Sequence, residues 1–143
     1  MVGNVELLNY IHQNSEMGLD TIKHLIDIAK DEGFKKTLQS QLEEYQSVYD
    51  NTNKKLQEFN KEAKNSSMFS KASSYIMINL NTVANKTPSH ISEMLIKGST
   101  LGIVDITKKM KEYRYADQEI LDLATKLLRF EEHNVEECKK YLQ

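Results

Sequence analysis

The stretch Ser15-Glu16-Met17-Gly18-Leu19 recurs 84 positions later as Ser99-Thr100-Leu101-Gly102-Ile103, and an isoleucine follows both copies at the same spacing. A second stretch, Leu42-Glu43-Glu44-Tyr45-Gln46, recurs 88 positions later as Phe130-Glu131-Glu132-His133-Asn134. Each copy lies in amphipathic sequence, so the chain has the pattern of two similar helical hairpins in tandem. Two such hairpins predict a four-helix bundle. The alternative is chance similarity between two amphipathic hairpins.

Apolar residues spaced alternately by three and four positions predict two helices in the first half, over residues 4–30 and 34–63. Gly33 can take the left-handed conformation that ends a helix, so the first hairpin is expected to turn at residues 31–33. The expected inward positions are Leu8, Ile11, Ser15, Gly18, Ile22, Leu25 and Ala29, then Leu38, Leu42, Tyr45, Tyr49, Thr52, Leu56 and Phe59.

The second half has its own start signals. Thr87 as a cap and Pro88 as the first helical residue predict a helix over residues 88–112, and Asp117 predicts the cap of a last helix that reaches residue 142. A shorter helix is expected over residues 68–84. The expected inward positions are Ile91, Leu95, Gly98, Gly102 and Ile106, then Ile120, Ala124, Leu127, Glu131, Asn134, Cys138 and Tyr141.

These elements predict an all-α fold, an antiparallel four-helix bundle of two αα-hairpins with a short extra helix in the long connection between them. The 143 residues fit one domain, and 39% hydrophobic with 28% charged residues is the composition of a soluble globular protein. A net charge of -2 gives no reason to expect nucleic acid as a partner.

Neither a signal peptide nor an apolar run of ~20 residues is evident, so we expect a cytoplasmic protein without a membrane partner. Cys138 is the single cysteine, which excludes an intramolecular disulfide. We expect its thiol to be a small buried hydrophobe, with a reactive thiol as the alternative.

Two short hairpin turns around one long connection give the topology of ferritin-like bundles. The chain resembles the small bacterial ferritin-like domains of uncharacterised function over essentially its whole length, in architecture and in phrases such as Ile11-His12-Gln13-Asn14-Ser15-Glu16-Met17-Gly18. The resemblance implies a metal core. In such a core, a glutamate from the first and third helices and Glu-x-x-His from the second and fourth enclose two iron or manganese ions.

Laid on this chain, that pattern finds Glu16, Thr100, Glu43-x-x-Gln46 and Glu131-x-x-Asn134. Amides are weak ligands for iron, so we expect a degenerate site and predict no cofactor. If a site exists, Glu16 and Glu131 are its candidate ligands. The alternative is an iron- or manganese-dependent oxidase or peroxide-handling protein with a non-standard carboxylate site that also includes Asp105.

Glu131 and Asn134 interrupt an otherwise apolar stripe. We expect the last helix to rotate slightly so that Glu131 reaches solvent at its edge. The alternative is a polar pocket in the core that holds water or a small cation, with Ser15 and Ser99 as the partners of the carboxyl.

Gly18 and Gly102 occupy matching places inside helices, where each costs about 1 kcal/mol relative to alanine. We expect them to allow close packing of the first helix against the third, with room for a ligand as the alternative. His90-x-x-Glu93 puts two polar groups on one helix face. We expect this pair to make a solvated cap interaction rather than a metal site.

The function expected from these observations is non-enzymatic self-association or binding of a protein partner. The contact surface is expected to include tyrosines and methionines, namely Tyr75, Met77, Met94, Met110 and Tyr113. The metal-dependent enzyme is the competing hypothesis, and a small-molecule binder in the bundle interior is the third.

Overall fold

The computed structural model describes residues 3–59 and 86–143, and these form four helices. Their bounds are α1 Asn4–Ile28, α2 Glu32–Glu58, α4 Pro88–Glu112 and α5 Gln118–Lys139. The predicted range 88–112 is confirmed, and the other three helices end two to five residues before their predicted limits. The predicted helix over residues 68–84 lies outside the described residues.

The helix starts follow from their cap residues. The hydroxyl of Thr87 accepts a hydrogen bond from the backbone N–H of His90, with Pro88 in the first turn, as predicted. At α2 the carboxylate of Asp31 accepts from the N–H of Phe34 at 2.8 Å. The prediction that Gly33 ends the first helix is wrong, because this cap at Asp31 places Gly33 inside the first turn of α2.

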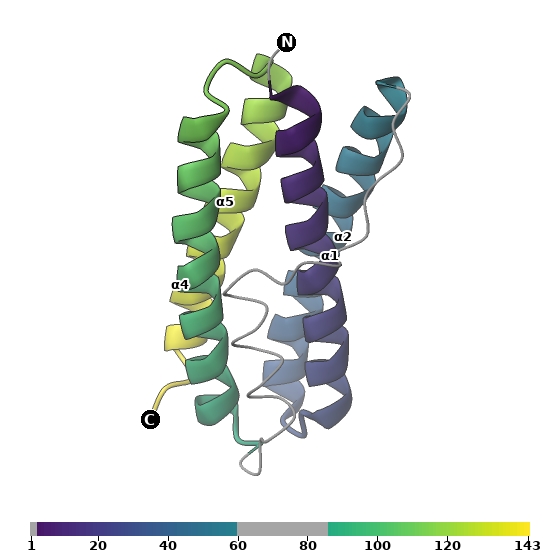
Figure 1. Ribbon diagram of the computed structural model, residues 1–143. Helices are drawn as coiled ribbons and strands as arrows, with labels where there is room; N and C mark the ends of the chain where they lie inside the picture. The colour runs from purple at the N-terminus through teal and green to yellow at the C-terminus, as the bar shows by residue number, and fades with distance from the viewer. Residues whose placement is uncertain (1–2, 60–85) are drawn as a thin grey trace.

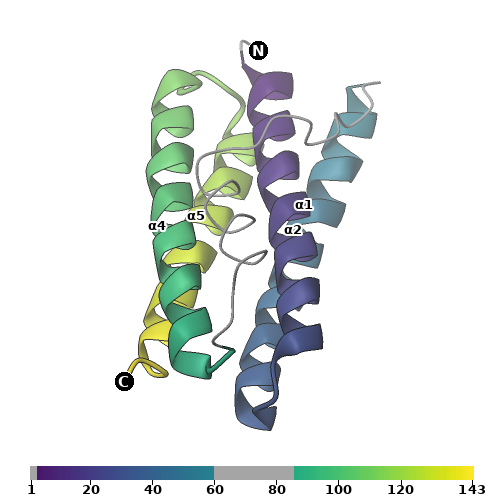
Figure 2. The same cartoon turned by 60° about the horizontal axis from the view of Figure 1, so that its bottom comes forward.

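The four helices pack as two antiparallel hairpins, α1 with α2 and α4 with α5 (Figure 1). A turned view keeps the hairpins side by side, with α1 next to α4 (Figure 2). α2 ends at the end of the bundle where α1 begins, whereas α4 begins at the opposite end (Figure 1). α1 therefore runs antiparallel to α4, and α2 runs antiparallel to α5. The predicted bundle of two hairpins is confirmed.

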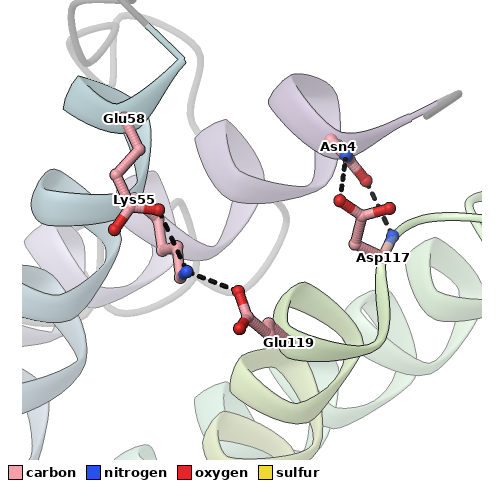
Figure 3. Close-up of polar contacts among 5 residues, drawn as sticks. All are labelled: Asn4, Lys55, Glu58, Asp117 and Glu119. Atoms are coloured by element: carbon pink, nitrogen blue, oxygen red, sulfur yellow. Dashed lines mark hydrogen bonds and ion pairs between the residues drawn. The ribbon is translucent and has the colours of Figure 1, made fainter.

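Polar contacts tie the hairpins together at one end of the bundle (Figure 3). The side-chain amide of buried Asn4 donates to the carboxylate of Asp117 at 3.0 Å, and the N–H of Asp117 donates back to the Asn4 oxygen at 2.8 Å. Asp117 thus uses its carboxylate for α1 rather than for capping α5. Beside this pair, Lys55 near the end of α2 bridges Glu58 and Glu119, with Nζ 2.5 Å from a Glu119 oxygen.

The opposite end is joined by Tyr141, which follows α5. Its hydroxyl shares a hydrogen bond of 2.7 Å with the hydroxyl of Thr37 on α2. Its ring meets the ring of Phe34 edge-on, with centroids 4.9 Å apart. Contacts at both ends therefore hold the two hairpins in one register.

The core fills the space between the helices along the predicted stripes, and its largest fully buried side chains include Leu7, Ile11, Phe34, Leu56, Ile91 and Leu127. Each such side chain contributes about 1.5–3 kcal/mol when it leaves water. All predicted inward positions of α4 are buried, and those of α5 are buried as far as Cys138. On α2 the stripe is rotated, because Gln41 and Val48 are buried while Leu42 and Tyr49 are only partly so.

None of the helices in the described ranges is both long enough and apolar enough to cross a membrane.

Candidate functional site

The two helical glycines face side chains within their own hairpins. A Cβ atom placed on Gly18 of α1 would overlap the ring of Tyr45 on α2, and one placed on Gly102 of α4 would overlap the carboxyl of Glu131 on α5. The prediction that these glycines bring the first helix close to the third is therefore wrong. The space beside each glycine is taken by a large side chain from the neighbouring helix, so it is not room for a ligand either.

These two glycine contacts show which residues of α2 and α5 occupy equivalent positions in the two hairpins. Gly18 and Gly102 are 84 positions apart, but the side chains that face them, Tyr45 and Glu131, are 86 apart. With that offset, buried residues of α2 fall on buried residues of α5. The matching pairs include Phe34 with Ile120, Leu38 with Ala124, Gln41 with Leu127, Val48 with Asn134 and Thr52 with Cys138.

The sequence match at an offset of 88 is therefore structurally wrong. It equates exposed Glu43 and Gln46 with buried Glu131 and Asn134. The Glu43-x-x-Gln46 pair that was to supply ligands from the second helix lies on the solvent side of α2. Thr100, which stands where the third helix would carry a glutamate, is also exposed, and its hydroxyl donates to the backbone carbonyl of Ile96.

Glu131 lies inside the bundle with only 2% of its surface exposed, so the expectation that it reaches solvent is wrong. Its Oε1 atom is buried and has no hydrogen-bond partner in the described part of the chain. Burial raises the pKa of this carboxyl to about 8, the amide of Asn14 opposes the shift, and the charge of Asp105 adds to it. The group is thus largely protonated at neutral pH.

Three further residues share this polar environment: Tyr10 and Asn14 on α1, and Asp105 on α4. Among the described residues, no group makes a hydrogen bond of standard geometry with the buried hydroxyl of Tyr10. Burial and then the charge of Asp105 raise the pKa of this phenol, and Asn14 favours its ionised form. We call Tyr10, Asn14, Asp105 and Glu131 the core polar cluster.

The sequence named Asp105 and Glu131 but missed the other two members of the cluster. The predicted partners of the carboxyl were serines, but the hydroxyl of Ser15 donates to the carbonyl of His12 at 2.9 Å. Ser99 makes no hydrogen bond to Glu131 within the described part of the chain. The available signal was the i, i+4 spacing of Tyr10 and Asn14, which places both on one face of the first helix.

Glu16 belongs to a different environment, between α1 and α2. Its neighbour His12 is 3% exposed, and within residues 3–59 and 86–143 neither nitrogen of that imidazole has a hydrogen-bond partner. The imidazole lies against the ring of Tyr49, with centroids 4.5 Å apart. Burial lowers the pKa of His12, while the charge of Glu16 and the side chain of Asn53 oppose this shift.

The candidate metal ligands are therefore divided. Glu16 faces His12, whereas Glu131 faces Tyr10, Asn14 and Asp105. Among residues 3–59 and 86–143, no three His, Cys, Asp or Glu side chains gather closely enough to hold a metal ion.

The remaining candidate site residues from the sequence make contacts close to their own positions or are simply buried. Among the described residues, the carboxylate of Glu93 pairs with Lys97 at 3.1 Å rather than with His90. Cys138 is buried, as predicted, and burial raises the pKa of its thiol. A thiol in that state is a poor nucleophile. His133 is exposed near Glu137.

Comparison with known proteins finds no family model, no curated protein sequence and no solved structure that matches this chain.

Proposed function

We propose that this protein is a ferritin-like bundle with a degenerate metal site, and that it works by association rather than as an oxidase. The topology supports the ferritin-like assignment, because two short-turned hairpins are joined by a connection between opposite ends of the bundle.

The chemistry of the core supports a non-enzymatic role. Glu131 takes the place of a ligand from the last helix, but its surroundings are a phenol, an amide and a second carboxyl rather than imidazoles. The second carboxylate, Glu16, lies beside His12 instead.

The surface of α4 carries the observation that favours association. Val104 projects from this helix with 46% of its surface exposed, and Tyr115 in the following turn is 67% exposed. The guanidinium of Arg114 lies over the Tyr115 ring at 4.7 Å from its centroid. Exposed aliphatic and aromatic side chains with a neighbouring arginine are enriched where proteins meet.

Three of the contact residues expected from the sequence do not belong to this exposed surface. Met94 is buried in the core, and Met110 and Tyr113 pack against it. Tyr75 and Met77 lie outside the described residues. The association surface we propose is therefore the outer face of α4 and its following turn, represented by Val104 and Tyr115, and the occupant is a second copy of this chain.

Sedimentation equilibrium tests this proposal. We expect the wild-type protein to self-associate in the range of about 1–100 μM, and Val104→Glu to weaken association at least tenfold. Leu142→Glu is the matched control, because Leu142 is 45% exposed but follows α5 at the other end of the bundle. A wild-type protein that stays monomeric above about 200 μM would refute the proposal.

A second candidate function rests on the two unpartnered oxygens of the core polar cluster. Within the described ranges, Oε1 of Glu131 and the hydroxyl of Tyr10 are buried without hydrogen bonds, and the side chains of Asp105 and Asn14 add further oxygens. A set of oxygen donors suits manganese or another hard cation better than a copper or zinc ion. Calorimetric titration with Mn²⁺ tests it: binding that Glu131→Gln abolishes and exposed His133→Gln preserves would favour this candidate.

A further inference from the structure

A pocket of about 520 Å³ lies in the groove between α2 and α5. Lys36 and Gln41 line it from α2, and Arg129, Phe130 and Asn134 line it from α5. Its volume falls within the range of small-molecule sites in proteins. None of these five residues belongs to the core polar cluster or to the proposed association surface.

Two amides form the inner side of this pocket. Gln41 and Asn134 are each only 4% exposed. The Asn134 side chain makes no hydrogen bond within the described residues, and Gln41 makes one long contact, from Nε2 to the sulfur of Cys138 at 3.7 Å. The polar atoms of these amides that make no hydrogen bond to the described residues are not fully enclosed, so they remain accessible from the pocket.

The packing of the bundle does not require these amides. With the offset of 86 positions between α2 and α5, Gln41 corresponds to Leu127 and Asn134 corresponds to Val48. Both apolar counterparts are buried, so the equivalent position in the other hairpin is filled by an apolar side chain. The amides therefore point to something polar that enters the pocket.

The rim of the pocket is positive. Lys36, Lys126 and Arg129 are exposed, and none of the three forms an ion pair with another residue in the described ranges. Of the two acidic residues there, Glu137 is bound by Lys140 at 2.6 Å, and this hydrogen bond lowers the pKa of Glu137. Among the described residues, the three cations at the rim thus lack an ion-pair partner, as does the carboxylate of Glu44, in a chain whose net charge is -2.

We propose that the pocket between α2 and α5 binds a small organic oxyanion, a phosphate or carboxylate carried on an aromatic body. Lys36, Lys126 and Arg129 neutralise the anion, and the guanidinium can donate two parallel hydrogen bonds to its oxygens. The amides of Gln41 and Asn134 hydrogen-bond its inner polar groups. Phe130 supplies an apolar wall for the ring. This site does not depend on self-association.

An NMR titration of ¹⁵N-labelled full-length protein tests the proposal with four probes: phenyl phosphate, benzoate, inorganic phosphate and phenol. We expect saturable shifts at Gln41, Phe130 and Asn134 with phenyl phosphate or benzoate, and weaker binding of inorganic phosphate and phenol. The stronger of the first two probes identifies whether the anion is a phosphate or a carboxylate. Absence of saturable shifts up to about 10 mM for all four probes would overturn the proposal.

Variants separate a built site from diffuse charge attraction. The double variant Lys126→Gln/Arg129→Gln should weaken binding at least tenfold, while Lys23→Gln, an exposed lysine on α1, should leave it unchanged. Asn134→Val copies the counterpart Val48 and should weaken binding while the protein stays folded. Equal weakening by Lys23→Gln would overturn the proposal. A monomeric protein that binds phenyl phosphate would refute only self-association, so the two proposals fail separately.

Discussion

The carboxyl of Glu131 occupies the space that a side chain on Gly102 would need. The two residues lie on neighbouring antiparallel helices, α4 and α5, and the absence of a Cβ atom lets the carboxyl enter the core. The other hairpin repeats the arrangement with Tyr45 beside Gly18. At equivalent places, one hairpin therefore buries a phenol ring and the other buries a carboxyl.

Gly18→Ala should lower the free energy of unfolding by about 1–3 kcal/mol, because the new methyl group must displace the buried ring of Tyr45. The gain in helix propensity, about 1 kcal/mol, does not offset this overlap. Urea denaturation measures the change. Gly33→Ala is the control, since its Cβ would meet only a carboxylate oxygen of Asp31 at 3.3 Å. Equal stability of Gly18→Ala and wild type would contradict the packing described.

Glu131→Gln should remove a pH dependence of stability. The folded protein holds the Glu131 proton up to pH about 8, whereas the unfolded chain releases it near 4.5. The stability this group provides is present below pH 4.5 and is lost as pH rises toward 8. The neutral amide has no such loss. Urea denaturation at pH 5, 6, 7 and 8 should show wild type losing stability relative to the variant, and parallel curves would show that the buried carboxyl is not protonated.

His12→Phe should have the opposite pH signature. Burial lowers the pKa of His12 in the folded state, so the stability linked to this group is lost as pH falls below about 6.5, where the unfolded chain takes up a proton. Phenylalanine keeps the ring contact with Tyr49 and removes two unpartnered nitrogens. Thermal melts at pH 5 and pH 7.5 should show the variant gaining most at pH 5. A gain confined to pH 7.5 would count against a neutral buried imidazole.

Two polar contacts at the same end of the bundle should contribute differently to the free energy of unfolding. Asn4→Ala should cost about 1–3 kcal/mol, because it leaves the Asp117 N–H and carboxylate without their partly buried partners. Glu119→Gln should cost much less, since its ion pair with Lys55 is exposed to solvent and screened by salt. Urea midpoints of both variants at low and high salt measure the difference. A larger cost for Glu119→Gln would reverse this ranking.

Local signals in the sequence were enough to predict that four helices form two hairpins. The start of α4 follows from Thr87 and Pro88, which both act within the first turn. The inward face of that helix follows from apolar spacing, and Ile91, Leu95 and Ile106 are buried as predicted.

The core site was not predictable from the same signals. Whether Glu131 faces solvent or core depends on a rotation of α5 that Gly102 makes possible, and Gly102 is on another helix. The offset of 86 positions between equivalent residues of α2 and α5 also depends on packing. The sequence match at 88 positions pairs Glu43, which is exposed, with Glu131, which is buried. Such rotations about a helix axis are set by tertiary contacts rather than by periodicity.

We propose that the core polar cluster around buried Glu131 does not hold a metal ion. Elemental analysis tests it most directly, on native protein purified without chelators from cells supplied with iron, manganese and zinc. We predict less than about 0.1 metal ion per chain, with Glu131→Gln indistinguishable from wild type. About one or two ions per chain, lost in Glu131→Gln, would contradict the claim and support the metal-dependent alternative.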